Sequence, residues 1–323
     1  MQPLQNPRSS PVAQRFRKPL PVRPGDTVAV VAPAGPFDRA SLETGVAVIG
    51  DRYRVRYDER IFSRRRYLAG DDDARFVELT GAFTDPEIKA VFCARGGYGA
   101  MRILARLGDW AASAAAAGKE IPGKPLIGFS DITALHQWLQ SNGLVSIHAP
   151  VLTQLGRLPV GSSERLISLL ESASPAAPLV GSETYVGGTV EGPLLGGNLS
   201  VFTRLLGTPF MPDLEGAVLV FEDVSEQPYR LDRMWLHLEL AGVFRQVKGI
   251  ALGQFLGCEP RDGGFTAGEV LRELAAATGL PCAAGFPVGH GDDVNEAVPL
   301  GVRVRLDADE RRLTFLEPAV GAG

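Results

Sequence analysis

The pattern of hydrophobic and polar residues predicts alternating strands and helices through the first half of the chain. Short apolar runs bounded by turn residues predict buried strands at residues 26–33, 87–94 and 126–129, and an alternating pattern predicts a strand at residues 53–57. Helix-like spacing or an acidic start predicts helices through residues 42–49, from residue 71 onward and over 101–107, and Ala-rich sequence around 110–118 is also helical in character. This alternation is typical of an α/β fold with a parallel sheet covered by helices on both faces. Ligands of such sheets bind beyond the carboxyl ends of the strands, where we expect three loops to meet: 32–37, 95–99 and the turn at Ser130.

The character of the sequence changes around residues 156–195, which are rich in Ser, Ala, Pro and Gly apart from one helix expected at 162–171. We place the domain boundary here. The expected organisation is a basic extension (1–24), an N-terminal α/β domain (25–160), a linker region (161–190) and a C-terminal domain (191–323). Beyond the linker we expect strands at 217–221, 249–255 and 282–286, helices at 199–206, 230–246 and 266–277, and a terminal hairpin of 302–306 with 312–316.

Ser130 lies where a predicted strand meets a predicted helix. The residues after it, including Ile132, Leu135 and Leu139, are spaced to share one helix face. Unpaired backbone N–H groups and the helix dipole stabilise negative charge at such a point, which suits a nucleophile. A serine or aspartate there also suits a helix cap, so Ser130 and Asp131 are candidates for capping as well as for catalysis.

Glu222 and His290 each follow a predicted strand, or a strand and a short turn. With Ser130 they supply the nucleophile, base and orienting carboxylate that acyl transfer needs. Glu222 could instead cap a segment or pair with an arginine. The segment from Gly128 to Ile132 lacks the second glycine of the G-x-S-x-G elbow, so the standard α/β-hydrolase fold is not supported.

The loop at residues 95–99 is rich in glycine and follows a predicted strand. It does not match the G-x-G-x-x-G pattern of dinucleotide-binding turns. Its backbone N–H groups could face Ser130 and complete an oxyanion hole, or the loop could be an ordinary tight turn.

Composition and charge narrow the class of protein. The chain has 323 residues, 45% of them hydrophobic and 22% charged, as in a globular protein with a substantial core. A net charge of −4 argues against a nucleic-acid partner. The three widely spaced cysteines suggest reduced residues of a cytoplasmic protein, and the four histidines form no HExxH pair, so no metal site is expected.

No run of 18 apolar residues is present, so no membrane span is expected. The first 24 residues carry five basic residues among several prolines, without the apolar core of a secretion signal. We therefore interpret residues 1–24 as a mobile extension.

Seven short segments together form a recognisable set: VAPAGP (31–36), CARGGYG (93–99), GFSDITAL (128–135), GGNL (196–199), FEDV (221–224), PYRLDRM (228–234) and GFPVGHG (285–291). This set resembles the L,D-carboxypeptidases of the S66 serine peptidase family, the muramoyl-tetrapeptide carboxypeptidases. The segments occur in family order from about residue 26 to the C-terminus. Two positions depart from the family pattern: Ala34, where serine is common, and Ala149, where glycine is common.

The resemblance implies a Rossmann-like N-terminal domain and a smaller β-rich C-terminal domain, with the active site at their interface. It implies Ser130 as nucleophile, His290 as general base and Glu222 as orienting acid. The amides of Asp131 and Gly97 would form the oxyanion hole. Candidates for substrate contact are Arg95, Gly96, Tyr98, Asn198, Arg230 and Arg233. A homodimer is expected, and no metal or organic cofactor is implied.

The activity implied is release of the terminal D-alanine from a muropeptide tetrapeptide during cytoplasmic recycling of cell-wall fragments. A sister activity of the family, of the microcin-immunity type, cleaves peptidyl-nucleotide antibiotics. An alternative of another class is a non-catalytic α/β protein that binds a muropeptide or small peptide without turnover. The presence of all three triad candidates favours an enzyme.

Overall fold

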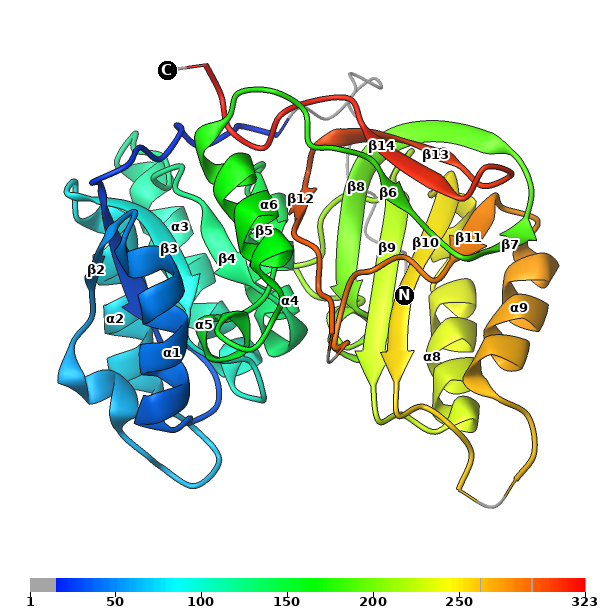
Figure 1. Ribbon diagram of the computed structural model, residues 1–323, viewed down its shortest axis with the longest axis horizontal. Coiled ribbons are helices and arrows are strands. Elements are labelled where there is room, and N and C mark those ends of the chain that lie inside the picture. The colour runs from blue at the N-terminus through cyan, green and yellow to red at the C-terminus, as the bar shows by residue number, and fades with distance from the viewer. Residues whose placement is uncertain (1–15, 262, 292, 323) are drawn as a thin grey trace.

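The computed structural model describes residues 16–261, 263–291 and 293–322. Its two β-sheets lie side by side, and each carries its own helices (Figure 1). The first sheet has six strands and the second has eight. The predicted α/β fold, with a parallel-sheet N-terminal part and a β-rich C-terminal part, is confirmed.

The first sheet is built mainly from the first 150 residues, in the order β12-β5-β4-β3-β1-β2. The bounds of its strands are β1 Thr27–Val31, β2 Arg54–Arg56, β3 Ile88–Cys93, β4 Leu126–Gly128, β5 Ser146–His148 and β12 Val298–Leu300. Strands β1 to β5 are parallel, whereas β12 arrives from the C-terminal part of the chain and pairs antiparallel with β5. The two parts of the chain are therefore joined by a shared sheet as well as by their connecting segments.

Alternating side chains of the first sheet enter two separate hydrophobic cores. Val28 and Val30 of β1 belong to one, while Ala29 and Val31 belong to the other. Burial on both faces explains why β1 is a continuous apolar run after Thr27. The helical elements of this part are α1 Arg39–Gly50, η1 Glu59–Phe62, α2 Asp72–Thr84, η2 Ala100–Ile103, α3 Leu104–Ala116, η3 Ser130–Ile132, α4 Thr133–Ser141, α5 Leu152–Leu155 and α6 Val160–Glu171.

The second sheet has the order β6-β14-β13-β8-β9-β10-β11-β7. The bounds of its strands are β6 Leu179–Val180, β7 Glu183–Val186, β8 Thr189–Asn198, β9 Val218–Val224, β10 Gly249–Leu256, β11 Cys282–Ala284, β13 Arg303–Asp307 and β14 Arg312–Phe315. Strands β8 to β11 are parallel, and the strands at both edges are antiparallel. Strands β13 and β14 form the predicted terminal hairpin.

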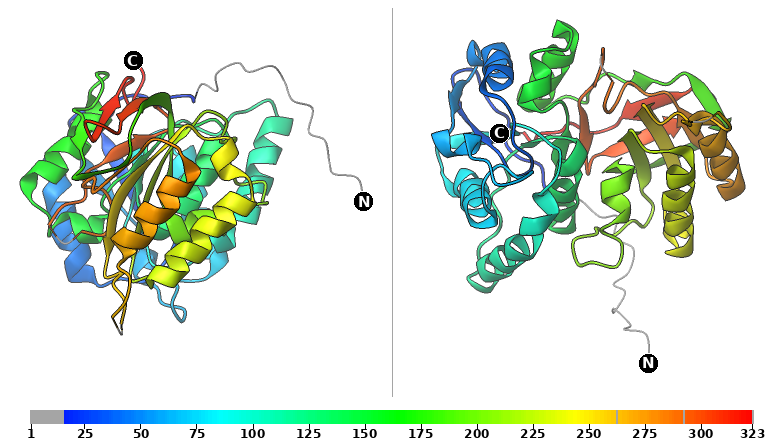
Figure 2. Two further views of the ribbon diagram at one scale, coloured as in Figure 1. Left: turned by 90° about the vertical axis from the view of Figure 1, so that its right-hand side faces the viewer. Right: turned by 90° about the horizontal axis from the view of Figure 1, so that it is seen from below.

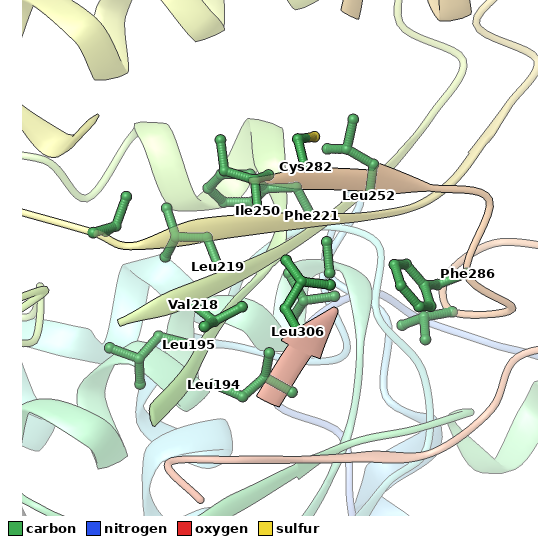
Figure 3. Close-up of a cluster of buried hydrophobic side chains, with 14 of the residues drawn as sticks. Leu194, Leu195, Val218, Leu219, Phe221, Ile250, Leu252, Cys282, Phe286 and Leu306 are labelled. Atoms are coloured by element: carbon green, nitrogen blue, oxygen red, sulfur yellow. The ribbon is translucent and has the colours of Figure 1, made fainter. Parts of the chain in front are cut away.

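A third hydrophobic core packs around the second sheet, with Leu219, Phe221, Ile250 and Leu252 among its members (Figure 3). The helical elements here are α7 Leu199–Thr203, α8 Pro228–Leu240, η4 Val243–Arg245 and α9 Ala267–Thr278. Helices α8 and α9 lie side by side against the second sheet (Figure 2, left). The helix expected over 230–246 is two elements, because Gly242 adopts a left-handed φ of 78° between α8 and η4.

The segment predicted as a linker, 161–190, contains more structure than its composition indicates. It holds most of α6, the edge strands β6 and β7 and the start of β8. These edge strands have two and four residues, too short for a hydrophobic pattern to reveal them. The domain boundaries themselves stay a prediction.

Part of the predicted N-terminal extension is packed against the rest of the molecule. Arg17 donates its backbone N–H to the Gly143 carbonyl at 2.7 Å, and Phe16 and Val22 are buried. Residues 1–15 of the extension lie outside the described residues. Within the described chain, no helix has both the length and the apolar character needed to cross a bilayer.

Candidate active site

Ser130, His290 and Glu222 meet in the space between the two sheets. The Ser130 Oγ lies 3.1 Å from Nε2 of His290, and Nδ1 of His290 lies 2.5 Å from Oε2 of Glu222. Ser130 follows β4 of the first sheet, Glu222 lies on β9 of the second, and His290 lies in the loop between β11 and β12. The sequence separations are 160 and 68 residues, so only the fold brings these side chains together.

The backbone at Ser130 is strained. Its φ is 64°, in the left-handed region that side-chain-bearing residues rarely adopt. Ser130 is the first residue of η3, two residues after β4 ends at Gly128. Within the described residues, no side-chain hydrogen bond caps η3 or α4, and the Ser130 hydroxyl pairs with His290 instead. Strain held at one polar residue is typical of functional sites.

Glu222 is fully buried, and two glycines make room for it. A Cβ on Gly289 would lie 2.7 Å from the Cβ of Glu222, and one on Gly253 would lie 3.3 Å from it. Burial alone would raise the pKa of Glu222, but the adjacent His290 and His148 outweigh it and lower the pKa to about 2. Glu222 is therefore an anion at neutral pH.

His290 is held between this carboxylate and an aromatic ring. Burial lowers the pKa of His290, but the charge of Glu222 outweighs it, so the net shift of the pKa is upward. The ring of Phe129 packs 4.6 Å from the imidazole, centroid to centroid. Such a histidine can accept the proton of Ser130 and hold it as an imidazolium that Glu222 stabilises.

The three loops predicted to gather at the strand ends do meet. Gly35 donates its N–H to the Gly96 carbonyl at 2.9 Å, and a Cβ on Gly96 would lie only 2.9 Å from the Cβ of Ser130. The Asp131 carboxylate accepts the N–H of Ala100 at 2.8 Å, which ties the glycine loop to the serine turn. Backbone groups thus approach Ser130 closely, whereas the assignment of the Asp131 and Gly97 amides to an oxyanion hole stays a prediction.

The remaining candidates on the first sheet lie at or near the glycine loop. The guanidinium of Arg95 bonds to the carbonyl of Pro36. Tyr98 is about half exposed, and its ring packs at 5.5 Å against Tyr67. Arg95 and Tyr98 thus belong to the same glycine loop, 95–99, as Gly96.

The sequence predicts Asn198 as a substrate-contacting residue, but in the structure its side chain binds other parts of the protein. Its side chain is only 4% exposed. Its Nδ2 donates to Asp223 at 3.0 Å, and its Oδ1 accepts the N–H of Val201 at 3.1 Å and caps α7. Both polar atoms of this amide already have protein partners.

Arg230 and Arg233 lie at the start of α8, beside a surface hollow. The hollow is lined by Arg204, Glu226, Tyr229, Arg230, Arg233 and Met234. Arg230 pairs with Glu226 at 3.4 Å, and both Arg230 and Arg233 lie over the Tyr229 ring. The hollow has three guanidinium groups and one carboxylate in its lining, so its net charge is positive. By charge, an anionic group is therefore the ligand that suits it.

Sequence reasoning missed two residues that support the site. His148, at the end of β5, is fully buried with Nε2 3.8 Å from Oε1 of Glu222. Asn295 accepts the N–H of Gly289 at 3.0 Å and so fixes the loop that carries His290. The available signal for His148 was its position at the end of a short buried strand, similar to the signal that singled out Ser130 and Glu222.

Among the residues that the structure describes, no cluster of three or more His, Cys, Asp and Glu side chains is arranged to hold a metal ion. The three cysteines, Cys93, Cys258 and Cys282, are free and buried.

Comparisons with known proteins match both parts of the chain. Residues 28–149 match the family model of the LD-carboxypeptidase N-terminal domain, and residues 191–306 match that of the LD-carboxypeptidase C-terminal domain. The murein tetrapeptide carboxypeptidase of Pseudomonas aeruginosa is 37% identical over 302 residues, which cover 88% of this chain and 94% of that protein.

Solved structures show the same two-domain arrangement. The muramoyltetrapeptide carboxypeptidase from Oxalobacter formigenes superposes with a TM-score of 0.78 at 28% identity, covering 92% of this chain and 100% of that one. The microcin C7 self-immunity protein MccF, solved with aspartyl sulfamoyl adenosine, has a TM-score of 0.79 at 22% identity, covering 94% and 99%. At this sequence identity, the similarity to MccF is a similarity of fold.

Proposed function

Because this chain belongs to the S66 family of LD-carboxypeptidases and is a serine-type carboxypeptidase, we propose that it releases the terminal D-alanine of muropeptide tetrapeptides. The observation that carries the proposal is the continuous contact from Ser130 through His290 to Glu222. The names of the P. aeruginosa and O. formigenes relatives support the choice of substrate.

In the proposed mechanism, His290 Nε2 takes the proton of Ser130 as Oγ attacks the carbonyl carbon that precedes D-alanine. The resulting oxyanion would be stabilised by the amides of Gly97 and Asp131. His290 then gives its proton to the leaving nitrogen, D-alanine departs, and an acyl-enzyme remains on Ser130. Water, activated by the same histidine, hydrolyses the acyl-enzyme. Glu222 holds the imidazole in position and stabilises its charged form throughout.

The leaving residue carries a free carboxylate that must be bound. Arg95 lies two residues before Gly97, and Arg230 and Arg233 line the hollow at the start of α8. We propose that one of these guanidinium groups receives the carboxylate, since bidentate binding of carboxylates is characteristic of arginine. Gly96 and Tyr98 would form the adjacent wall, and Asn198 would act by holding α7 and Asp223 in place.

We further propose that the protein acts in the cytoplasm, where cell-wall fragments are recycled, and that it forms a homodimer. The domain boundaries given above are part of the same proposal. The three free, buried cysteines support the choice of the cytoplasm, since disulfides are rare in reducing compartments. The oligomeric state can be measured by light scattering during size-exclusion chromatography.

The test is mass spectrometry of a defined substrate panel after incubation with the purified protein. The panel holds muropeptide tetrapeptides that differ in the third residue, the matching tripeptides, a tetrapeptide ending in L-alanine, and aspartyl sulfamoyl adenosine. We expect loss of D-alanine from tetrapeptides only, and none with Ser130→Ala. Cleavage of the sulfamoyl adenosine alone would assign the microcin-immunity activity. Binding of a tetrapeptide without turnover, measured by calorimetry, would assign the non-catalytic function.

A further inference from the structure

A second histidine stands behind the carboxylate that His290 contacts. Oε2 of Glu222 pairs with His290, while Oε1 faces Nε2 of His148 at 3.8 Å. His148 and Glu222 both have no exposed side-chain surface. The carboxylate therefore lies between two imidazoles, one on each side.

Neither facing atom has another partner in the described part of the chain. Oε1 of Glu222 and both ring nitrogens of His148 make no hydrogen bond there. A buried charged oxygen without a donor costs free energy, and so does a buried N–H without an acceptor. A distance of 3.8 Å is longer than a hydrogen bond, and closing this gap would satisfy both atoms.

The pairing of β5 with its two neighbouring strands places His148 close to the Ser130 turn and opposite Glu222. His148 lies on β5, paired with Gly128 on one side and Val298 of β12 on the other. Gly128 is two residues before Ser130, and Phe129 packs edge-on against His148 at 5.8 Å. The first sheet thus supplies Ser130 and His148, and the second supplies Glu222.

The neighbouring buried histidine does not share this role. Nε2 of His136 pairs with the carbonyl of Gly128 at 2.8 Å. The titratable groups that face Glu222 are His290 and His148 on either side, Asp223 beside it on β9 and the more distant thiol of Cys258 after β10. Of these, the two histidines are the groups whose ring nitrogens face its carboxylate oxygens, at 2.5 Å for His290 and 3.8 Å for His148.

We propose that His148 is a positioning residue of the hydrolase: its Nε2–H donates to Oε1 of Glu222 and fixes the carboxylate in register with His290. This inference rests on the proposed roles of Ser130, Glu222 and His290. The hydrogen bond from His148 withdraws charge from the Glu222 carboxylate, so the carboxylate attracts the proton on His290 less strongly. His290 therefore stays largely neutral down to a lower pH than it would without His148.

The test compares two amides at this position. In His148→Gln the side-chain NH₂ reaches about where Nε2 lies, whereas the shorter amide of His148→Asn cannot span the gap to Glu222. His148→Leu removes the donor but retains bulk. His237→Leu, on the exposed face of α8, is the control for loss of a histidine. Activity is followed as D-alanine release and, independently, as the labelling rate of Ser130 by a fluorophosphonate, each against pH.

We expect His148→Asn and His148→Leu to lose about 10- to 100-fold in kcat with little change in KM, as for one lost hydrogen bond to a charged group. Their acidic limbs should move to higher pH. His148→Gln should stay within about threefold of wild type, since it restores that bond. A packing role would lower the melting temperature of all three variants and leave the acidic limb in place, which would overturn the proposal.

Equal impairment of His148→Gln and His148→Asn would also overturn it, even if His148→Leu fails to fold. Failure of the proposed function has a different signature. If wild type is labelled at Ser130 but releases no D-alanine, the substrate is wrong, and the pH dependence of labelling still tests His148. If wild type is not labelled at all, the triad and the role of His148 fall together.

Discussion

At Ser130 the sequence places a serine where the backbone favours glycine. Its φ of 64° costs about 1–2 kcal/mol relative to glycine in the same turn. The turn holds the hydroxyl toward His290 rather than leaving it to cap α4. A residue that costs stability at a strand end is more simply explained by chemistry than by folding.

Two substitutions at Ser130 separate the catalytic role of its hydroxyl from the cost of its strained backbone. Ser130→Ala should fold with an unchanged melting temperature and lose about 10⁴-fold or more in kcat, because the nucleophile is gone and the strain stays. Ser130→Gly should be equally inactive but more stable, by about 1 kcal/mol. Kinetics and thermal melting of both variants provide the check. Near wild-type turnover by a folded Ser130→Ala protein would exclude Ser130 as the nucleophile.

Replacing Glu222 by glutamine tests the carboxylate without changing its size. Its negative charge raises the pKa of His290 above the ordinary value of about 6.5, so the base becomes neutral only as pH rises through that raised pKa. Glu222→Gln removes the charge. We expect kcat to fall sharply, because the imidazolium loses its partner, and the acidic limb of kcat/KM to move to lower pH.

A structural role for Glu222 predicts a different outcome. The melting temperature would fall, while the midpoint of the pH profile stayed in place. A stable Glu222→Gln variant with unchanged kcat and an unmoved acidic limb would remove Glu222 from the triad.

The residues that could be predicted from the sequence are those with a local signature. Ser130 and Glu222 directly follow apolar runs, and His290 lies between two glycines. His148 also ends a strand, but β5 has only three residues, and the carboxylate that His148 faces is on the other sheet. Asn198 was predicted to face substrate, and only the fold reveals that Asp223 and α7 occupy its amide.

At the scale of elements, the site depends on how closely loops can approach Ser130. The glycine loop and the serine turn touch at Gly96, where any side chain would meet Ser130. Such close approach is a physical reason for glycine that does not involve an unusual φ.

Gly96→Ala should therefore damage catalysis more than folding. The added Cβ would lie 2.9 Å from Cβ and 3.2 Å from Oγ of Ser130, so the loop or the serine must move. We expect kcat to fall at least about tenfold, since small displacements of catalytic groups are costly. Gly81→Ala, where nothing lies within 4 Å of the added Cβ on α2, is the matched control and should keep full activity. Equal activity of the two variants would contradict the close contact.

In the first sheet, strands β1 to β4 were predicted from the sequence, whereas β5 and β12, with three residues each, were not. The predicted strands are separated by helical segments, so pattern and topology agree for them. In the second sheet β8 contains Gly192, Pro193, Gly196 and Gly197, which indicate a loop when considered alone. It is a strand because β9 and β13 pair with it on either side. Tertiary pairing overrides local propensity there.

On the scale of the whole molecule, the two sheets are interlocked rather than merely adjacent. β12, from the last quarter of the chain, pairs with β5 of the first sheet, and Phe16, from its beginning, packs into the core of the second. The triad adds side-chain contacts between the two parts. Neither part completes its own sheet or core without residues from the other.

This interlocking predicts that the molecule unfolds in one cooperative transition, although multi-domain proteins often do not. The three tryptophans can report on each part. Trp110 and Trp138 pack together beside the first sheet, and Trp235 lies in the core of the second. Trp235→Phe leaves emission only from the first part, and the double variant Trp110→Phe, Trp138→Phe leaves emission only from the second.

The test is urea unfolding of both variants, followed by fluorescence, by far-ultraviolet circular dichroism and by loss of Ser130 labelling. Because the substitutions shift stability by different amounts, each fluorescence midpoint is compared with the circular dichroism midpoint of the same variant. We expect the three curves to coincide within each variant, because opening β12 from β5 breaks up both parts at once. A fluorescence midpoint well below that of circular dichroism in one variant would show that its part unfolds alone, and that the site is lost by separation of the sheets.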